Sequence, residues 1–165
     1  MPVKRRERQT VISAFFILVI LVIDQISKTL VVANLTIGQS IPIINNILHV
    51  TFVKNTGAAF GLFKNSTPVF IAISIIAVTF IAWLILGSIK KANFFSNKAF
   101  DIGLILILSG ALGNLIDRLK GGYVIDFIDF RIWPVFNIAD TSITLGTALL
   151  IISLHFKSCF KCKLK

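Results

Sequence analysis

The sequence predicts an α-helical integral membrane protein with four transmembrane helices and a small β-sheet between the first two. Of its 165 residues, 56% are hydrophobic and only 15% are charged, and the mean hydropathy is +0.89. Soluble domains contain about 45–50% apolar and about 25% charged residues. Because a transmembrane helix needs roughly 20 apolar residues, the chain has room for about four spans. We therefore expect a single membrane domain over residues 1–165, with spans at approximately 11–33, 68–89, 100–119 and 140–157.

The positive charge lies in three short basic clusters. The formal net charge is +10, and eleven of the seventeen Lys and Arg residues lie within residues 4–8, 90–98 and 157–165. An even number of spans separates successive clusters, so all three share one side, which the positive-inside rule makes the cytoplasm. The charge therefore indicates topology and contact with lipid headgroups, and no nucleic-acid function is expected.

The first span contains an ionisable pair, Asp24 and Lys28. The basic N-terminus resembles a secretory signal, but the apolar stretch of residues 11–33 is too long for a typical signal core, so we expect no cleavage. Residues four apart lie on one face of a helix, where opposite charges partly neutralise each other. Two interpretations remain: a structural pair that bonds loop backbone near the outer end, or direct participation in chemistry.

Residues 36–66 are expected to form an extracytoplasmic β region. The stretch Ile47–Val53 is rich in β-branched and aromatic residues, which predicts a strand. One face of it would hold Leu48, Val50 and Phe52. After it, Asn55 and Gly57 suit a tight turn that lets the backbone approach a ligand closely. The second span then begins at Pro68, where a missing N–H is harmless.

The stretch from residue 110 to residue 140 holds four of the seven acidic residues. They are Asp117, Asp126, Asp129 and Asp140. Only sixteen uncharged residues separate Asp140 from Lys157, and sixteen helical residues reach about 24 Å across a hydrocarbon core of roughly 30 Å. If Lys157 reaches the inner headgroups, Asp140 is held near the outer boundary. A carboxylate there must pair or take up a proton.

Asp126 and Asp140 are the predicted catalytic pair. Two carboxyl groups in a poorly hydrated place hold one proton between them, as in aspartic proteases. One takes a proton from the attacking water, while the other polarises the scissile carbonyl. Asn114 and Asn137 are neutral amides that can orient the pair. Arg118 could bind a substrate carbonyl or brace a carboxylate.

Simpler interpretations of this stretch also stand. Asp129 is expected to be a surface salt-bridge partner of the flanking Arg131. Asn137 and Asp140 could merely cap the fourth helix. Gly121 and Gly122 suit a helix end followed by a turn.

The sequence does not offer the residues that other catalytic mechanisms need. His49 and His155 fall on opposite sides of the membrane in this topology, so neither a histidine-based triad nor a zinc site can be built from them. A Ser–Lys protease using Ser142 and Lys120 has no supporting motif. Cys159 and Cys162 form a lone CxxC that is most simply a pair of free thiols. We expect no metal and no cofactor.

The motifs together resemble the lipoprotein signal peptidase (signal peptidase II) family of bacteria. They are Asp24 in the first span, NTGAAF at 55–60, GALGNLIDR at 110–118, VIDF at 124–127 and FNIAD at 136–140. The resemblance covers nearly the whole chain in order. It implies a four-helix aspartic endopeptidase of the bacterial cytoplasmic (inner) membrane, with both termini cytoplasmic and a periplasmic sheet that cradles the substrate.

The resemblance also implies a substrate and a set of site residues. The substrate is a prolipoprotein whose lipobox cysteine carries diacylglycerol, cut just before that cysteine. Asp126 and Asp140 match the catalytic pair. The positions that line the family's active site correspond here to Asn55, Gly110, Asn114, Arg118 and Asn137. The positions that support that site correspond to Asp24, Lys28 and Asp117. A monomer that binds the cyclic peptide globomycin is expected. The alternatives are a small transporter or proton-conducting protein that uses the intramembrane Asp and Lys residues, and a non-enzymatic assembly factor.

Overall fold

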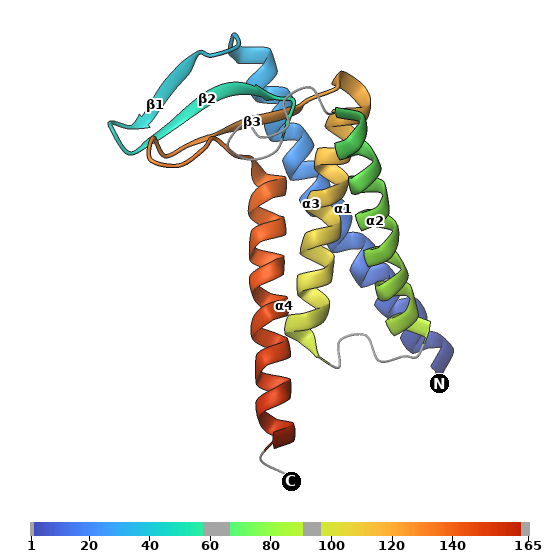
Figure 1. The fold of residues 1–165 in the computed structure, drawn as a ribbon. Coiled ribbons are helices and arrows are strands. Elements are labelled where there is room, and N and C mark those ends of the chain that lie inside the picture. The colour runs from blue at the N-terminus through green and yellow to red at the C-terminus, as the bar shows by residue number, and fades with distance from the viewer. Residues whose placement is uncertain (1, 58–66, 91–96, 163–165) are drawn as a thin grey trace.

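Four helices form a bundle with a three-stranded sheet at one end. The computed structural model describes residues 2–57, 67–90 and 97–162. Its helices are α1 (Pro2–Asn34), α2 (Thr67–Lys90), α3 (Lys98–Gly121) and α4 (Ile138–Cys162), and its strands are β1 (Ser40–Ile44), β2 (Leu48–Asn55) and β3 (Val124–Asp129). Figure 1 shows the start of α1 and the end of α4 at the opposite end of the bundle from the sheet. We call these the basic end and the sheet end.

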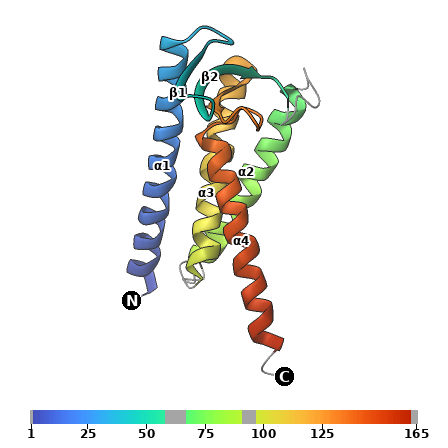
Figure 2. The same ribbon diagram turned by 90° about the vertical axis from the view of Figure 1, so that its left-hand side faces the viewer.

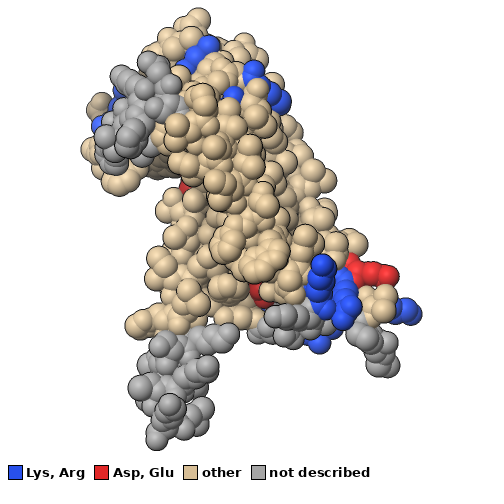
Figure 3. Space-filling model, turned by 45° about the vertical axis from the view of Figure 1, so that its right-hand side comes forward, with Lys and Arg blue, Asp and Glu red and all other residues tan. Residues whose placement is uncertain are grey.

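The four helices are long and apolar enough to cross a membrane, which confirms the predicted fold class. The face of the molecule shown in Figure 3 has a broad middle zone almost free of charged atoms, with Lys and Arg gathered toward both ends. An uncharged belt between charged ends is the surface expected for a protein surrounded by lipid. The expectations for the basic loop around residues 91–96 and for the side chains of Cys159 and Cys162 fall outside the described residues.

Helix α3 is the central helix of the bundle, as the two views in Figures 1 and 2 show. It packs against α1, α2 and α4. Toward the basic end, an apolar cluster joins α2 to α3; its buried members are Ile85, Ile89, Leu104, Ile105 and Leu108. Glycines let α3 and α4 approach closely: a Cβ on Gly103 would lie 2.8 Å from the carbonyl oxygen of Gly146. Small residues at such crossings are typical of membrane helices.

The sheet has the order β1-β2-β3, and both pairings are antiparallel. The segment Val124–Phe127, whose position soon after Gly121 and Gly122 favours an apolar loop, is instead the first part of strand β3, so the loop interpretation is wrong. Its partner β2 lies about seventy residues earlier in the chain, and strand pairing at that separation leaves no local signal. A further apolar cluster of Val31, Leu35, Phe52 and Phe127 fixes the sheet on the end of α1.

The predicted strand is present as β2, but its alternation is interrupted. The register of β2 against β3 shifts between Val50 and Val53, and Thr51 and Phe52 are both buried. A bulge of this kind adds one residue to one strand and re-aims the side chains that follow. Beyond the bulge, Asn55 reaches the same side of the sheet as Asp126.

The helix ends follow the local sequence. Gly122 ends α3 with φ at +77° and returns its N–H to the carbonyl of Arg118, as the Gly121-Gly122 pair predicts. At the other end of α3, Asn97 caps the helix and Asp101 lies buried in the first turn. The threonine before Pro68 donates its hydroxyl to the carbonyl of Gly122, 2.7 Å away, and ties the start of α2 to the end of α3.

Candidate active site

Two carboxylates approach each other at the sheet end from two different elements. Asp126 is the third residue of β3, and its side chain is 2% exposed. Asp140 lies in the first turn of α4 and is partly exposed. The short connection between β3 and α4 is held to the strand by backbone bonds between Ile128 and Phe136. This return of the chain brings the start of α4 back beside β3.

Asn137 joins the two carboxylates. Its backbone N–H donates to Asp140 Oδ2 at 3.3 Å, and its Oδ1 accepts from the N–H of Asp140 at 2.8 Å, so the two residues cap α4 reciprocally. Its amide nitrogen donates to Asp126 Oδ1 at 2.7 Å. The fully buried Asn137 therefore both caps α4 and orients the two carboxylates.

Asn114 on α3 holds the other side of the pair. Its amide nitrogen donates to Asp140 Oδ1 at 2.7 Å. Its amide oxygen accepts from Asn137 and from the Lys28 ammonium, each at 3.1 Å. Since the oxygen faces two donors, the amide orientation is fixed, and an NH₂ group must face Asp140.

Lys28 is the centre of a buried ionic cluster with Asp24 and Asp117. Its Nζ lies 2.9 Å from Asp24 Oδ2 and 2.8 Å from Asp117 Oδ2, and the whole cluster is buried. With the bond to Asn114, the ammonium makes three contacts to oxygen, which matches its three donors. Such a buried pair is stable only when its hydrogen bonds are complete.

The same cluster positions the backbone beside each carboxylate of the pair. Asp24 Oδ1 accepts from the N–H of Ala139 at 3.0 Å, directly before Asp140. Asp117 Oδ2 accepts from the N–H of Ile125 at 3.2 Å, directly before Asp126. Of the two interpretations of Asp24 and Lys28, these contacts favour the structural one, a pair that bonds backbone near the sheet end.

Asn55 and Gly57 border Asp126 from β2. The Asn55 amide donates to Asp126 Oδ2 at 2.9 Å, and its oxygen accepts from the N–H of Gly57 at 3.0 Å. Each oxygen of Asp126 thus receives one side-chain amide. The rest of the predicted turn, residues 58–61, lies outside the described residues.

Burial and, to a smaller extent, the nearby charge of Asp140 raise the pKa of Asp126 to about 6. Hydrogen bonds from Asn55 and Asn137 and the charge of Lys28 act against this rise. A carboxyl group with this pKa exchanges its proton near neutral pH, as a general acid requires.

Gly110 and Arg118 lie on α3 at two sides of the site. A Cβ on Gly110 would collide with the carbonyl oxygen of Ala139, so glycine is needed for α3 to meet the start of α4. The Arg118 guanidinium lies 5.3 Å from the centre of the Phe70 ring. Among the described residues it makes no ion pair with either carboxylate, although their charges and that of Asp117 act on it.

Asp129 lies outside this arrangement. Its carboxylate forms the expected ion pair with Arg131, at 3.5 Å, and accepts from the hydroxyl of Thr51 at 2.7 Å. It is buried on the sheet, so the expectation of a surface position was wrong. The strand pairing that covers Asp129 could not be seen from its immediate neighbours.

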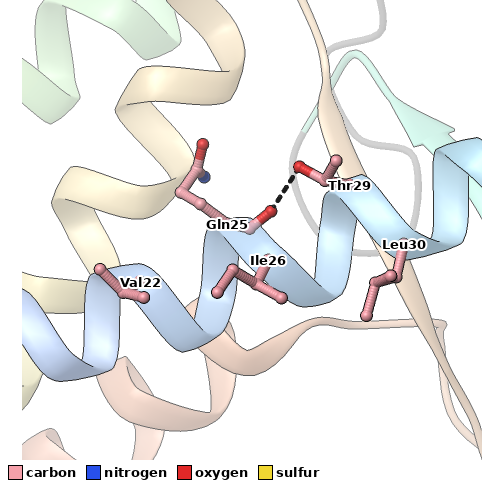
Figure 4. Close-up of a pocket in the computed structure, with 5 residues that line it drawn as sticks. All are labelled: Val22, Gln25, Ile26, Thr29 and Leu30. Atoms are coloured by element: carbon pink, nitrogen blue, oxygen red, sulfur yellow. Dashed lines mark hydrogen bonds between the residues drawn. The ribbon is translucent and has the colours of Figure 1, made fainter.

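Gln25 is a polar residue of the cluster that was not predicted from the sequence. Its Nε2 donates to Asp117 Oδ1 at 2.9 Å and lies within 3.3 Å of Asp24 Oδ2 and the Gly113 carbonyl. Three residues before Lys28 on the same helix face, its spacing could have revealed it. Figure 4 shows Gln25 beside Thr29 in a shallow groove of α1 whose other lining residues are Val22, Ile26 and Leu30. That apolar groove holds neither carboxylate of the pair.

The fold and the site define a class of protein: a four-helix membrane protein with two convergent carboxylates at one end. The comparisons identify the family. The family model described as Signal peptidase (SPase) II matches residues 16–156. Lipoprotein signal peptidase of Clostridioides difficile is 45% identical over 146 residues, covering 86% of this chain and 95% of that protein. The Halothermothrix orenii protein of the same name is 43% identical, with coverage of 84% and 91%.

Solved structures agree with this assignment. A bacterial membrane enzyme determined by the in meso method at 2.3 Å is similar with a TM-score of 0.80 and 34% identity, and the match covers 88% of each chain. A second, at 1.9 Å, gives 0.75 and 35%, covering 86% of this chain and 91% of that one. The chain belongs to the signal peptidase II family and is a multi-pass membrane peptidase. The predicted family is confirmed, and the transporter alternative is not favoured.

Proposed function

We propose that this peptidase is an aspartic endopeptidase that removes the signal peptide from diacylglyceryl-modified prolipoproteins, just before the lipidated cysteine. One observation carries the catalytic type: Asp126 and Asp140 are both bonded to Asn137, which holds them at one point of the sheet end. We call these two residues the dyad. The substrate follows from the relatives, which carry the name lipoprotein signal peptidase.

Asp126 acts as the acid of the dyad. It is the more deeply buried member, and burial and the charge of Asp140 raise its pKa to about 6. In its protonated form it donates a hydrogen bond to the scissile carbonyl and stabilises the charge that develops on that oxygen. Asn55 and Asn137 keep its carboxyl plane fixed while the proton moves.

Asp140 acts as the base. It is partly exposed, so water can reach it, and it receives hydrogen bonds from the Asn114 amide and the Asn137 backbone. These donors support the ionised form. Asp140 takes a proton from water as the water oxygen attacks the carbonyl carbon. During this attack Asp126 gives its proton to the carbonyl oxygen. The proton on Asp140 then passes to the leaving nitrogen as the C–N bond breaks, and Asp126 takes its proton back from the new hydroxyl as the carboxylic acid product forms.

The other site residues position the substrate or the dyad. Arg118 binds a substrate backbone carbonyl with its planar guanidinium, next to the charges of the dyad. Gly57 offers backbone beside Asn55, and Gly110 lets α3 reach the start of α4. The Lys28 cluster acts through the backbone, by holding the residue before each member of the dyad.

The membrane delivers the substrate. We propose that the protein lies in the bacterial cytoplasmic membrane as a monomer, with both termini cytoplasmic and the sheet end on the periplasmic side. The acyl chains of the substrate then stay in the bilayer and bring the scissile bond to the sheet end by lateral diffusion, which supplies much of its orientation. Globomycin, a cyclic peptide, is expected to occupy the same site.

The test is cleavage of a diacylated lipobox peptide by the purified protein in detergent. Asp126→Asn and Asp140→Asn should each reduce kcat by at least about a thousandfold, because each removes one half of the proton transfer. Asp129→Asn is the matched control: it changes a buried aspartate of the same strand outside the site, and should retain activity. The same peptide without its lipid tests the substrate class. Cleavage retained by either dyad variant would refute the catalytic assignment.

A further inference from the structure

The far end of the sheet exposes a group of apolar side chains that the active site does not use. This group, which we call the sheet tip, comes from β1, from the β1–β2 turn and from the segment after β3. Its members are Ile41, Ile43, Ile44, Ile47, Ile132 and Trp133. Ile132 is 93% exposed and Trp133 is 62% exposed. Contiguous exposed apolar side chains mark a surface that contacts something other than water.

These residues come together through the strand pairing. Ile44 is paired with Leu48 across the β1–β2 turn, and His49 is paired with Asp129 at the end of β3. The turn and the segment after β3 therefore lie at the same end of the sheet. Arg131 ties the segment after β3 to the start of β1, because its Nη2 donates to the hydroxyl of Ser40 at 3.0 Å.

The position of the tip indicates what covers it. In Figure 1 the sheet extends sideways past α4, and the β1–β2 turn lies at about the height where α4 begins. Asp140, in the first turn of α4, marks that height on the bundle. In a membrane, this places the tip beside the outermost part of the spans, over lipid and away from the bundle.

The composition of the tip fits a bilayer interface. Residues 40–48 contain no charged side chain, and residues 130–136 contain only Arg131. A tryptophan beside isoleucines, with one arginine at the edge, is the pattern found where protein meets the headgroup region. Both faces of β1 are exposed, with Ile41 and Ile44 on one face and Pro42 on the other. A strand that is apolar on both faces is better suited to immersion than to lying flat on the surface.

We infer that the sheet tip inserts into the lipid headgroup region at the sheet end and anchors the sheet to the bilayer. The occupant of this surface is phospholipid, with Arg131 placed to meet a headgroup phosphate. The anchor has a consequence for the site. Strand β3 runs directly from the tip to Asp126, so insertion fixes the height of Asp126 above the membrane.

The test uses tryptophan fluorescence, because the chain contains only Trp83 and Trp133. Trp83→Phe leaves Trp133 as the single emitter. The full-length protein is placed in vesicles of phosphatidylcholine and phosphatidylglycerol, with bromine atoms near either the carbonyl end or the methyl end of the acyl chains. We expect bromine near the carbonyl end to quench Trp133 most, and acrylamide in the water to quench it weakly.

Two variants of the same residue supply the matched control. Ile132→Asp places a charge in the tip, and because Ile132 is almost fully exposed the fold does not depend on it. It should shift Trp133 emission to longer wavelength and reduce bromine quenching by about half or more, whereas Ile132→Leu should change neither. Far-ultraviolet circular dichroism checks that both variants keep their helix content.

Three results would overturn the inference. The first is strong acrylamide quenching with none by bromine, which places the tip in water. Another is bromine quenching that disappears as the protein-to-lipid ratio rises, which points to a second copy of the chain on the tip. The last is equal bromine quenching in the Asp and Leu variants. None of these measurements depends on peptide cleavage, so they are independent of the proposed function.

Discussion

Replacement of Asp126 by asparagine should change how the stability of the protein depends on pH. The side chain keeps its shape but can no longer ionise. Burial and the charge of Asp140 raise the pKa of Asp126 from 3.8 to about 6. This rise in pKa corresponds to a difference of about 3 kcal/mol between the two protonation states. The folded protein thus binds this proton more tightly than the unfolded chain does.

The sign of the effect follows from that difference. The stability due to the bound proton is fully present below the unfolded pKa and is lost as pH rises through the folded value. From about pH 4 to about pH 8, the free energy of unfolding of the wild type should therefore fall by about 3 kcal/mol relative to that of Asp126→Asn. The assay is unfolding in mixed detergent micelles, titrated with sodium dodecyl sulfate at several pH values.

Asp129→Asn is a control for which the opposite pH dependence of stability is expected. Burial acts to raise the pKa of Asp129, but hydrogen bonds from Thr51 and the Arg131 backbone and the charge of Arg131 outweigh it, and the pKa is lowered. The stability contributed by the Asp129 carboxylate is present above its unfolded pKa and is lost as pH falls through its folded pKa. As pH is lowered, the free energy of unfolding of the wild type should therefore fall relative to that of Asp129→Asn. A pH-independent difference between the wild type and Asp126→Asn, or a slope of the same sign for both variants, would refute the reasoning.

Two further predictions concern packing and the buried cluster. Gly110→Ala should destabilise the protein by about 1–3 kcal/mol, because its Cβ would meet the carbonyl of Ala139, whereas Gly87→Ala, which faces open space in the same kind of helix, should be neutral or stabilising. Detergent unfolding of the pair measures this, and equal effects would contradict the close helix contact. Gln25→Leu should cost about 1–3 kcal/mol, since it removes the amide that bonds two buried carboxylates, while Thr29→Val in the same groove should cost little. The opposite order of the two losses would show that the amide is dispensable.

The four helices were accessible from the sequence because their signals are local. Hydropathy and charge runs define the spans, and the motifs around Asp24 and Asn114 each lie within a single helix. Gly122 as a helix end is equally local, since a positive φ favours glycine. These features can be predicted without knowing which distant segment of the chain packs against them.

The features that were missed depend on distant pairing. Strand β3 is defined by β2, and the bulge at Thr51 and Phe52 decides that Asn55 reaches Asp126. The residues near Asp117 and Asp24 in the chain do not identify which backbone N–H groups these carboxylates accept from, namely those of Ile125 and Ala139. Some site residues bond the carboxylates of the dyad, and others bond the backbone next to them. Only the three-dimensional structure shows which residue does which.

The pH dependence of peptide cleavage tests the joint proton of the dyad most directly. The ratio kcat/KM for a diacylated lipobox peptide reports the ionisation of the free enzyme. If Asp126 must be protonated while Asp140 is ionised, kcat/KM should fall as pH rises above about 6, the pKa of Asp126. A rate that instead rises through this range to an alkaline plateau would show that the reaction needs both carboxylates ionised, and would contradict a shared proton.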